Sequence, residues 1–253
     1  MMDKQHIANT IIVVVLLAFA FSYRFEGAFT LSNWLATFFV TFVLVAFSVS
    51  MHNFAQGKIA NHYLADIHTQ VFAAGSLTTL ITMFLSSGTI IYASPWTLKL
   101  KSLFSTTLGK RLAPGPSEFA KIALAGTLTS LFIAVGAQLL TPFLGQIAEI
   151  LVKINVAIAI SSLIPFLTLF PHTIPYASAL ASKPKADEAP HTIGDHLFFG
   201  SRPLWAFSIA FVSAAGVGLL LYDSLYVLLG ALFAGLLVWL AWLYHVEGFK
   251  PKP

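Results

Sequence analysis

Long apolar runs separated by short polar segments dominate this sequence. A helix rises about 1.5 Å per residue, so about 20 residues cross the roughly 30 Å hydrocarbon core of a bilayer. The pattern predicts an all-α, polytopic membrane bundle of about six to seven transmembrane helices, forming one integral membrane domain over residues 1–253. The runs are Ile7–Tyr23, Leu31 to about Phe54, Val71–Tyr92, Lys121 to about Leu144, Ile150 to about Phe170, Pro203–Tyr222 and Leu225–Tyr244.

The third and the last of these runs have features that affect topology. Glycine, serine and threonine interrupt Val71–Tyr92, which either crosses the bilayer or enters it and returns. The polar, proline-containing stretch 94–118 is predicted to lie outside the bilayer, and the stretch 172–201 is predicted to be a loop. Residues 1–30 then form a first helix and turn, and residues 203–253 form a C-terminal helical hairpin and tail. Small residues suit the packing faces of that hairpin, among them Gly216, Gly218, Gly230 and Gly235.

Composition supports a membrane protein and excludes several other classes. The chain is 57% hydrophobic and 9% charged, whereas soluble domains are about 25% charged. It has no cysteine, which excludes disulfides and thiolate metal sites. The net charge of +4 comes from basic residues scattered through short loops, so it predicts no nucleic-acid partner. With seven spans, the positive-inside tendency places the N-terminus outside the cell membrane and the C-terminus in the cytoplasm.

One compact polar cluster interrupts the apolar pattern, in the segment Val49–Tyr63. Polar groups at membrane depth are costly and usually mark a site or a partner. His52 and Gln56 are four residues apart, so they share one helix face, as do the two histidines of a zinc-binding HExxH motif. Here the motif reads H-N-F-A-Q, in which Asn53 cannot take up a proton and Gln56 is a poor metal ligand. The cluster comprises His52, Asn53, Gln56, Asn61 and His62.

Three segments in order resemble the site-2 proteases, which are intramembrane zinc metalloproteases, and especially their archaeal homologues. Val49–Tyr63 is similar to the family segment that begins HELAH. Ala55, Ala60 and Tyr63 match residues of that segment at the same spacing from His52. The resemblance implies a protease-like core over residues 31–211, in which a zinc-holding helix packs against the helices that complete the site.

The second and third segments of the resemblance lie further along the chain. Lys121–Leu131 is similar to the family's AGPxxN helix, with Thr127 in place of proline and Ser130 in place of asparagine. Asn155–Pro165 resembles the helix that leads into the family's NLxPxxPLDG motif, with Ser162 at the asparagine position.

The resemblance also implies a third zinc ligand, an aspartate. An ungapped alignment places residues 169–171 on the LDG motif and loses this ligand, whereas an insertion places residues 193–195 there and supplies Asp195, which we favour. His52 and Asp195 alone are fewer than the three protein ligands usual for catalytic zinc. A rearranged site could add His62 or His196.

Each candidate also has a structural interpretation. His52 can form an interhelical hydrogen bond to a serine or threonine on another span. Asn53 and Gln56 can serve as polar packing between helices. Asp195 can cap a helix that begins near Leu197.

Two functional hypotheses follow. The first is a proteolytically inactive, site-2 protease-like membrane protein without a cofactor, acting as a scaffold, a binding protein or a subunit of a membrane complex. The second is an active intramembrane zinc metalloprotease with a rearranged metal site. Both place the chain in a lipid bilayer, with other membrane proteins or transmembrane substrate helices as partners.

Overall fold

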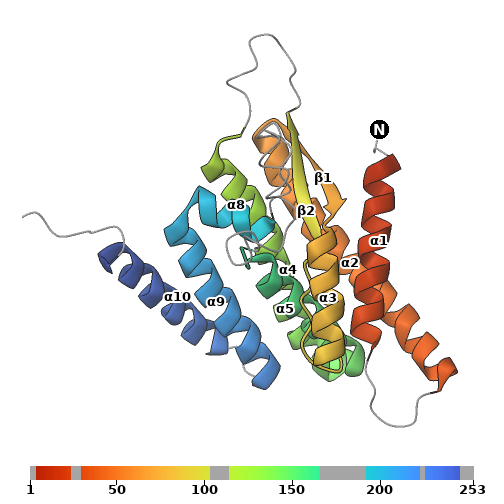
Figure 1. Cartoon of the computed structure of the whole chain (residues 1–253). Helices are drawn as coiled ribbons and strands as arrows, with labels where there is room; N and C mark the ends of the chain where they lie inside the picture. Colours follow the sequence, from red (N-terminus) through yellow and green to blue (C-terminus); the bar gives the residue numbers. More distant parts are fainter. Residues whose placement is uncertain (1–3, 24–29, 103–113, 166–191, 223–225, 246–253) are drawn as a thin grey trace, which may run out of the picture.

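The computed structural model describes residues 4–23, 30–102, 114–165, 192–222 and 226–245 (Figure 1). Helices make up most of this part of the chain. The elements are α1 (Lys4–Ser22), α2 (Leu31–His62), β1 (Ala65–Val71), α3 (Ala73–Leu85), β2 (Trp96–Ser102), α4 (Pro116–Leu144), α5 (Gln146–Ser162), α8 (Ile193–Gly200), α9 (Arg202–Leu221) and α10 (Tyr226–His245).

The prediction of a membrane protein agrees with the length and composition of the helices. Within the described residues, four helices are long and apolar enough to cross a bilayer, and these are Gln5–Ser22, Leu31–His62, Pro116–Leu144 and Arg202–Leu221. Two shorter apolar helices, Ala73–Leu85 and Tyr226–Trp242, accompany them.

The all-α prediction is wrong in one region, where β1 and β2 form a two-stranded antiparallel sheet. Alternation explains both strands. In β1, Ala65, Ile67 and Thr69 are buried while Asp66 is exposed, as expected for a strand with one face on the core. In β2, Trp96 and Leu98 are likewise buried and Lys99 is exposed, while Thr97 is buried with the two apolar residues.

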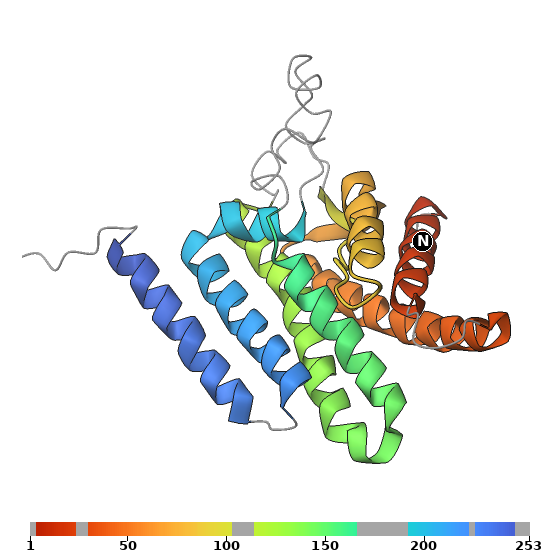
Figure 2. The same ribbon diagram turned by 60° about the horizontal axis from the view of Figure 1, so that its bottom comes forward.

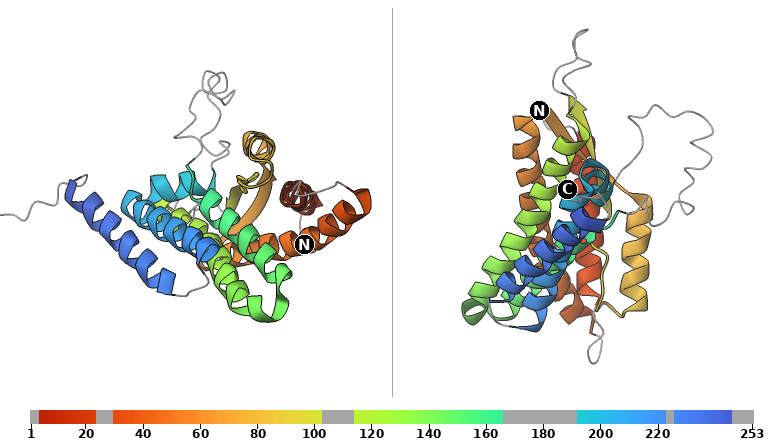
Figure 3. Two further views of the ribbon diagram at one scale, coloured as in Figure 1. Left: turned by 90° about the horizontal axis from the view of Figure 1, so that it is seen from below. Right: turned by 90° about the vertical axis from the view of Figure 1, so that its left-hand side faces the viewer.

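The sheet changes the interpretation of the apolar run Val71–Tyr92. Val71, the first residue of this run, is the last residue of β1. The helix that follows, α3, has only 13 residues, or about 20 Å of helix, which is too short to cross a bilayer. The helix ends in a turn where Ser87 and Gly88 have φ angles of 51° and 78°. In side view α3 stands beside the bundle rather than within it (Figure 3, right).

Helices α4 and α5 form the centre of the bundle. Helix α4 begins with Pro116, a favoured first helical residue, and the Gly115 N–H donates to Glu118 Oε2 at 2.7 Å. On one side the α9–α10 pair lies against this centre, and on the other α2 crosses α4 obliquely (Figure 2). The short helix α8 packs on the first part of α4.

The small residues of the last helical pair are partly explained by packing. A Cβ on Gly218 would collide with Val227, and one on Gly235 would lie 3.0 Å from Phe207, so both glycines permit close helix contact as predicted. The same prediction is wrong for Gly230, where a Cβ would meet nothing within 4 Å.

The two ends of the described chain lie toward the same end of the bundle. Figure 1 shows α1 beginning, and α2, α5 and α10 ending, at the end where the sheet lies. The seven-span prediction placed the two termini on opposite sides. It differs from this arrangement because residues 71–92 contain no spanning helix.

Candidate functional site

The polar cluster lies where α2 crosses α4. Both His52 and Gln56 are fully buried, one helical turn apart on the inner face of α2. The His52 imidazole Nδ1 and the Ser130 hydroxyl Oγ lie 2.9 Å apart in a buried hydrogen bond between the two helices. The predicted interhelical bond from His52 to a serine on another span is therefore confirmed.

Gly126 allows this close approach. An ideal Cβ on Gly126 would lie 2.6 Å from His52 Cδ2 and 2.7 Å from Gln56 Nε2, and it would also collide with His52 Nε2. Gln56 Nε2 points toward the Ala123 carbonyl oxygen at 3.5 Å, a long contact. The imidazole and the amide thus pack directly on the backbone of α4.

Further hydroxyl and amide pairs join the same helices to α5. Thr127 Oγ1 and Ser162 Oγ lie 2.8 Å apart, so a side chain of the second segment meets one of the third. Asn155 Nδ2 donates to Ser48 Oγ at 2.9 Å, which links α5 back to α2. The three segments quoted for the family resemblance therefore converge on one place, the junction of α2, α4 and α5.

Trp96, in β2, is a part of the site that the sequence analysis missed. Its ring meets the edge of the His52 ring at right angles, with 5.6 Å between ring centroids, and the tryptophan is fully buried. The stretch W-T-L-K-L alternates apolar and polar residues, which is the signal that could have predicted a strand here.

Asn53 occupies the position of the family's catalytic glutamate but points away from His52 and Gln56. Its Nδ2 donates to the Thr69 hydroxyl in β1 at 3.3 Å. The direction follows from helix geometry, because residues i and i+1 face about 100° apart. Asn53 therefore links α2 to the sheet, which agrees with the structural interpretation as polar packing.

Asp195 lies in the first turn of α8, where it acts as a capping residue. Its Oδ2 accepts the Thr192 N–H at 2.9 Å and the Thr192 hydroxyl at 2.7 Å, and Thr192 Oγ1 accepts the Asp195 N–H at 3.2 Å. The capping prediction is right only in part, because the N-cap is Thr192, Asp195 is the third helical residue of the capping box, and the helix starts at Ile193 rather than near Leu197.

The two other metal candidates lie elsewhere. His62 is exposed in the last turn of α2, with its ring against Tyr63 at 5.1 Å between centroids. His196 stacks on Phe119, with 5.1 Å between centroids and 20° between ring planes.

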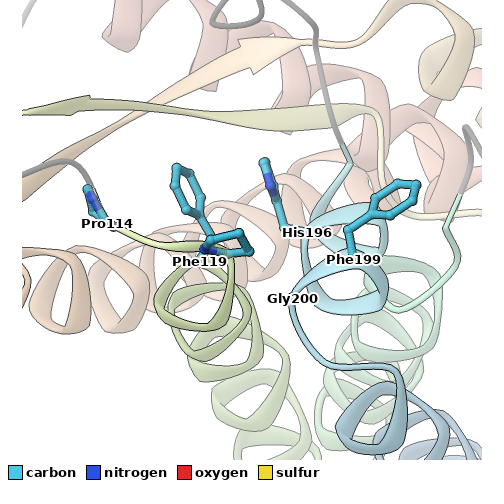
Figure 4. A pocket seen from close by; sticks show the side chains of 6 residues that line it. Pro114, Phe119, His196, Phe199 and Gly200 are labelled. Carbon is cyan, nitrogen blue, oxygen red and sulfur yellow. The ribbon is translucent and has the colours of Figure 1, made fainter. Parts of the chain in front are cut away.

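His196 belongs to a separate open pocket where α8 meets the start of α4. Figure 4 shows Phe119 and His196 side by side, with Phe199 beyond them. The pocket has a volume of about 470 Å³ and is lined by Pro114, Pro116, Phe119, His196, Phe199 and Gly200.

The described residues do not fit the zinc that the family resemblance implies. They include no group of three histidine, aspartate or glutamate side chains arranged to hold a metal, so His52, His62, Asp195 and His196 do not form such a site. Among the described residues, the groups placed against the His52 ring include a hydroxyl, a glycine backbone and an indole ring. Zinc prefers imidazole, thiolate and carboxylate ligands, and catalytic sites usually use three of them.

Comparison with known proteins adds no independent evidence of family. No family model matches the chain, and no curated protein or solved structure is significantly similar to it. The resemblance therefore depends on the three sequence segments themselves.

Proposed function

We propose that this chain is a multi-pass membrane protein with a silent, site-2 protease-like centre, acting as a scaffold, binding protein or subunit for other membrane proteins. The observation that carries the proposal is the buried His52–Ser130 hydrogen bond. It engages Nδ1 of the imidazole that would otherwise be the first metal ligand, while Nε2 is buried beside Gly126 with no hydrogen-bond partner among the described residues.

The convergence of three separate segments supports the proposal that the centre is site-2 protease-like. His52, Ser130 and Ser162 each occupy a position matched to a family motif, and their helices meet at one junction. Random similarity in apolar helices would not require the matched positions to lie together.

The chemistry of the side chains supports the proposal that the centre has no proteolytic activity. Metal-assisted peptide hydrolysis needs a metal that polarises water and a group that accepts its proton. Gln56 is an amide that bonds a carbonyl of α4, and Asn53 is an amide that bonds β1. Neither amide can act as a base near neutral pH.

The arrangement of charges supports a cytoplasmic location for both termini. Lys58 lies near the end of α2, Lys121 near the start of α4 and Arg202 at the start of α9, all toward the end where the sheet lies (Figure 1). Cytoplasmic ends of membrane helices are enriched in lysine and arginine. This orientation keeps the expected C-terminal side and reverses the side expected for the N-terminus.

Metal analysis of the purified protein tests the silent centre. We expect well below one zinc per chain in detergent-purified protein, with no difference between the native chain, His52→Ala and His68→Ala. His68 is the matched control because it lies in β1 and is not one of the candidate ligands of the rearranged site. One zinc per chain that is lost in His52→Ala and kept in His68→Ala would overturn the proposal in favour of the rearranged metalloprotease.

Proteolysis of a model transmembrane substrate gives a second test. The native chain should leave the substrate intact in co-expression. Cleavage by the native chain that disappears in His52→Ala would contradict the silent centre. Cleavage that appears only after Asn53→Glu combined with Gln56→His would show that the family's catalytic groups alone are missing.

A further inference from the structure

Helix α1 covers the edge of β1 that β2 leaves open. On one side β1 pairs with β2, and on the other the Thr69 N–H donates to His6 Nδ1 at 2.9 Å. Asn9, three residues along α1, donates from Nδ2 to the Thr69 carbonyl oxygen at 3.0 Å. The two side chains thus satisfy both backbone groups of a residue that is 1% exposed. An uncovered strand edge readily pairs with other chains, so this cover has a clear structural purpose.

The hydrogen bond to His6 depends on its protonation state. Nδ1 can accept the Thr69 N–H only when it carries a lone pair, so the imidazole must be neutral with its proton on Nε2. Protonation places a second hydrogen on Nδ1, and two N–H groups then face each other. The bond becomes repulsive without any other change in the structure.

The charges around His6 favour its release once it is protonated. The His68 ring meets the His6 ring edge-on at 5.8 Å between centroids, and His68 Nε2 lies 3.6 Å from Asp66 Oδ2. Lys99 on β2 is paired in register with His68. Asp66, which is 53% exposed, is also paired in register with Lys101 of β2, so basic groups outnumber the acidic one among the described residues at this edge of the sheet.

The other helices that pack on α1 contribute little to the charge around His6. Helix α2 carries Lys58 and His62 near this end, and these contact Phe54 and Tyr63 respectively. Helix α3 contains no ionisable side chain.

We propose that α1 and β1 form a pH-sensitive latch, in which neutral His6 holds the start of α1 on the edge of β1 and protonation of His6 releases it. Thr69 also accepts a hydrogen bond from Asn53, the residue next to His52, so release of α1 removes support from the α2 side of the polar cluster. The latch does not depend on the proposed function, because its residues lie outside the motif matches apart from Asn53.

Distance measurement between two spin labels tests the latch. The chain has no cysteine, so Ala8→Cys on α1 with Asn61→Cys on α2 gives two exposed labelling sites and no others. In nanodiscs of uncharged lipid, we expect one narrow distance at about pH 7.5 and a longer, broader one at about pH 5. These values bracket the ordinary histidine pKa of about 6.5.

Two variants separate His6 from other titrating groups. In His6→Asn, Oδ1 can still accept the Thr69 N–H and does not titrate, so the narrow distance should persist at both pH values. In His68→Gln the pH response should remain. An unchanged distance in the native chain, or a pH response that persists in His6→Asn, would overturn the proposal.

Hydrogen exchange gives a readout without labels. After correction for the intrinsic pH dependence of exchange, the Thr69 amide should exchange roughly tenfold faster relative to the α4 core at about pH 5 than at about pH 7.5. Equal protection at both pH values would contradict the latch even if the labelled variants fold poorly.

Discussion

The Nδ1 atom of His52 and the Oγ atom of Ser130 lie 2.9 Å apart, although the two residues are 78 positions apart in the sequence. This bond, with Gly126 beside it, fixes where α2 crosses α4. It uses chemistry common between membrane helices, in which a polar group finds its partner on a neighbour because lipid offers none. The histidine that most suggests catalysis thus has a well-defined structural role.

A double-mutant cycle should measure this bond. We expect His52→Phe and Ser130→Ala to show a coupling energy of about 0.6 to 2 kcal/mol in unfolding by SDS, the range found for hydrogen bonds between membrane helices. Thr129→Ala is the matched control, because the Thr129 hydroxyl donates to the Ala125 carbonyl oxygen of its own helix at 2.9 Å. Equal coupling of His52 to both positions would show that packing, rather than the hydrogen bond, joins the two residues.

Two glycines of α4 should respond oppositely to alanine. Gly126→Ala places a methyl group against the His52 ring, and overpacking of this kind costs about 1 to 3 kcal/mol. Gly136→Ala meets nothing within 4 Å and should be neutral or stabilising by up to about 1 kcal/mol, because alanine favours helix. Thermal unfolding in one detergent compares them, and equal melting temperatures would contradict the packing described at Gly126.

The role of Asp195 can be tested by separating stability from metal binding. Asp195→Ala removes the acceptor for two hydrogen bonds from Thr192 and should lower the unfolding free energy by about 1 to 2 kcal/mol. Glu118→Ala, which removes the carboxylate from the start of α4, is the reference for capping and should cost less because Glu118 is only partly buried. A loss of bound zinc in Asp195→Ala but not in Glu118→Ala would instead identify Asp195 as a ligand.

Tyr92 should make the protein less stable in alkali. Burial raises the pKa of the Tyr92 phenol far above its ordinary value, the nearby Asp195 charge raises it further, and the neighbouring Ser94 side chain partly opposes the shift. Between the unfolded pKa of about 10 and the higher folded pKa, the folded state holds a proton that the unfolded state has lost. The unfolding free energy should therefore fall above pH 10, by at most about 1.4 kcal/mol per pH unit.

The corresponding measurement compares two tyrosines. Denaturant unfolding between about pH 9 and about pH 11.5 should show this loss in the native chain and in Tyr222→Phe, whose tyrosine is 63% exposed. In Tyr92→Phe the unfolding free energy should fall less steeply with pH. The same slope in all three proteins would assign the effect to another group.

The sequence predicted the long helices well because a run of apolar residues leaves the backbone in lipid no alternative but helix. It also predicted the shared face of His52 and Gln56, since spacing by four residues fixes that geometry. The partner of His52 could be narrowed only to a serine or threonine on another span, because the crossing of α2 and α4 depends on packing between segments far apart in the chain.

The sheet was missed for a physical reason. Only Val71 of β1 lies in the apolar run Val71–Tyr92, and the polar residues of β1 and the lysines of β2 resemble loops. Each strand is short, and its pairing partner lies beyond an intervening helix. Periodicity of two in both segments was the available signal, but a strand of seven residues gives a weaker signal than the long apolar runs on either side.

The obliqueness of α2 makes the depth of its buried histidine dependent on the membrane around it. The 21 residues from Leu31 to Met51 span about 31 Å of helix, so an upright α2 would bring His52 to the headgroups. Tilt lowers that rise and draws the imidazole into hydrocarbon. A thinner bilayer increases the angle between α2 and the bilayer normal, and a thicker one decreases it. Lipid composition therefore changes the strain where α2 crosses α4.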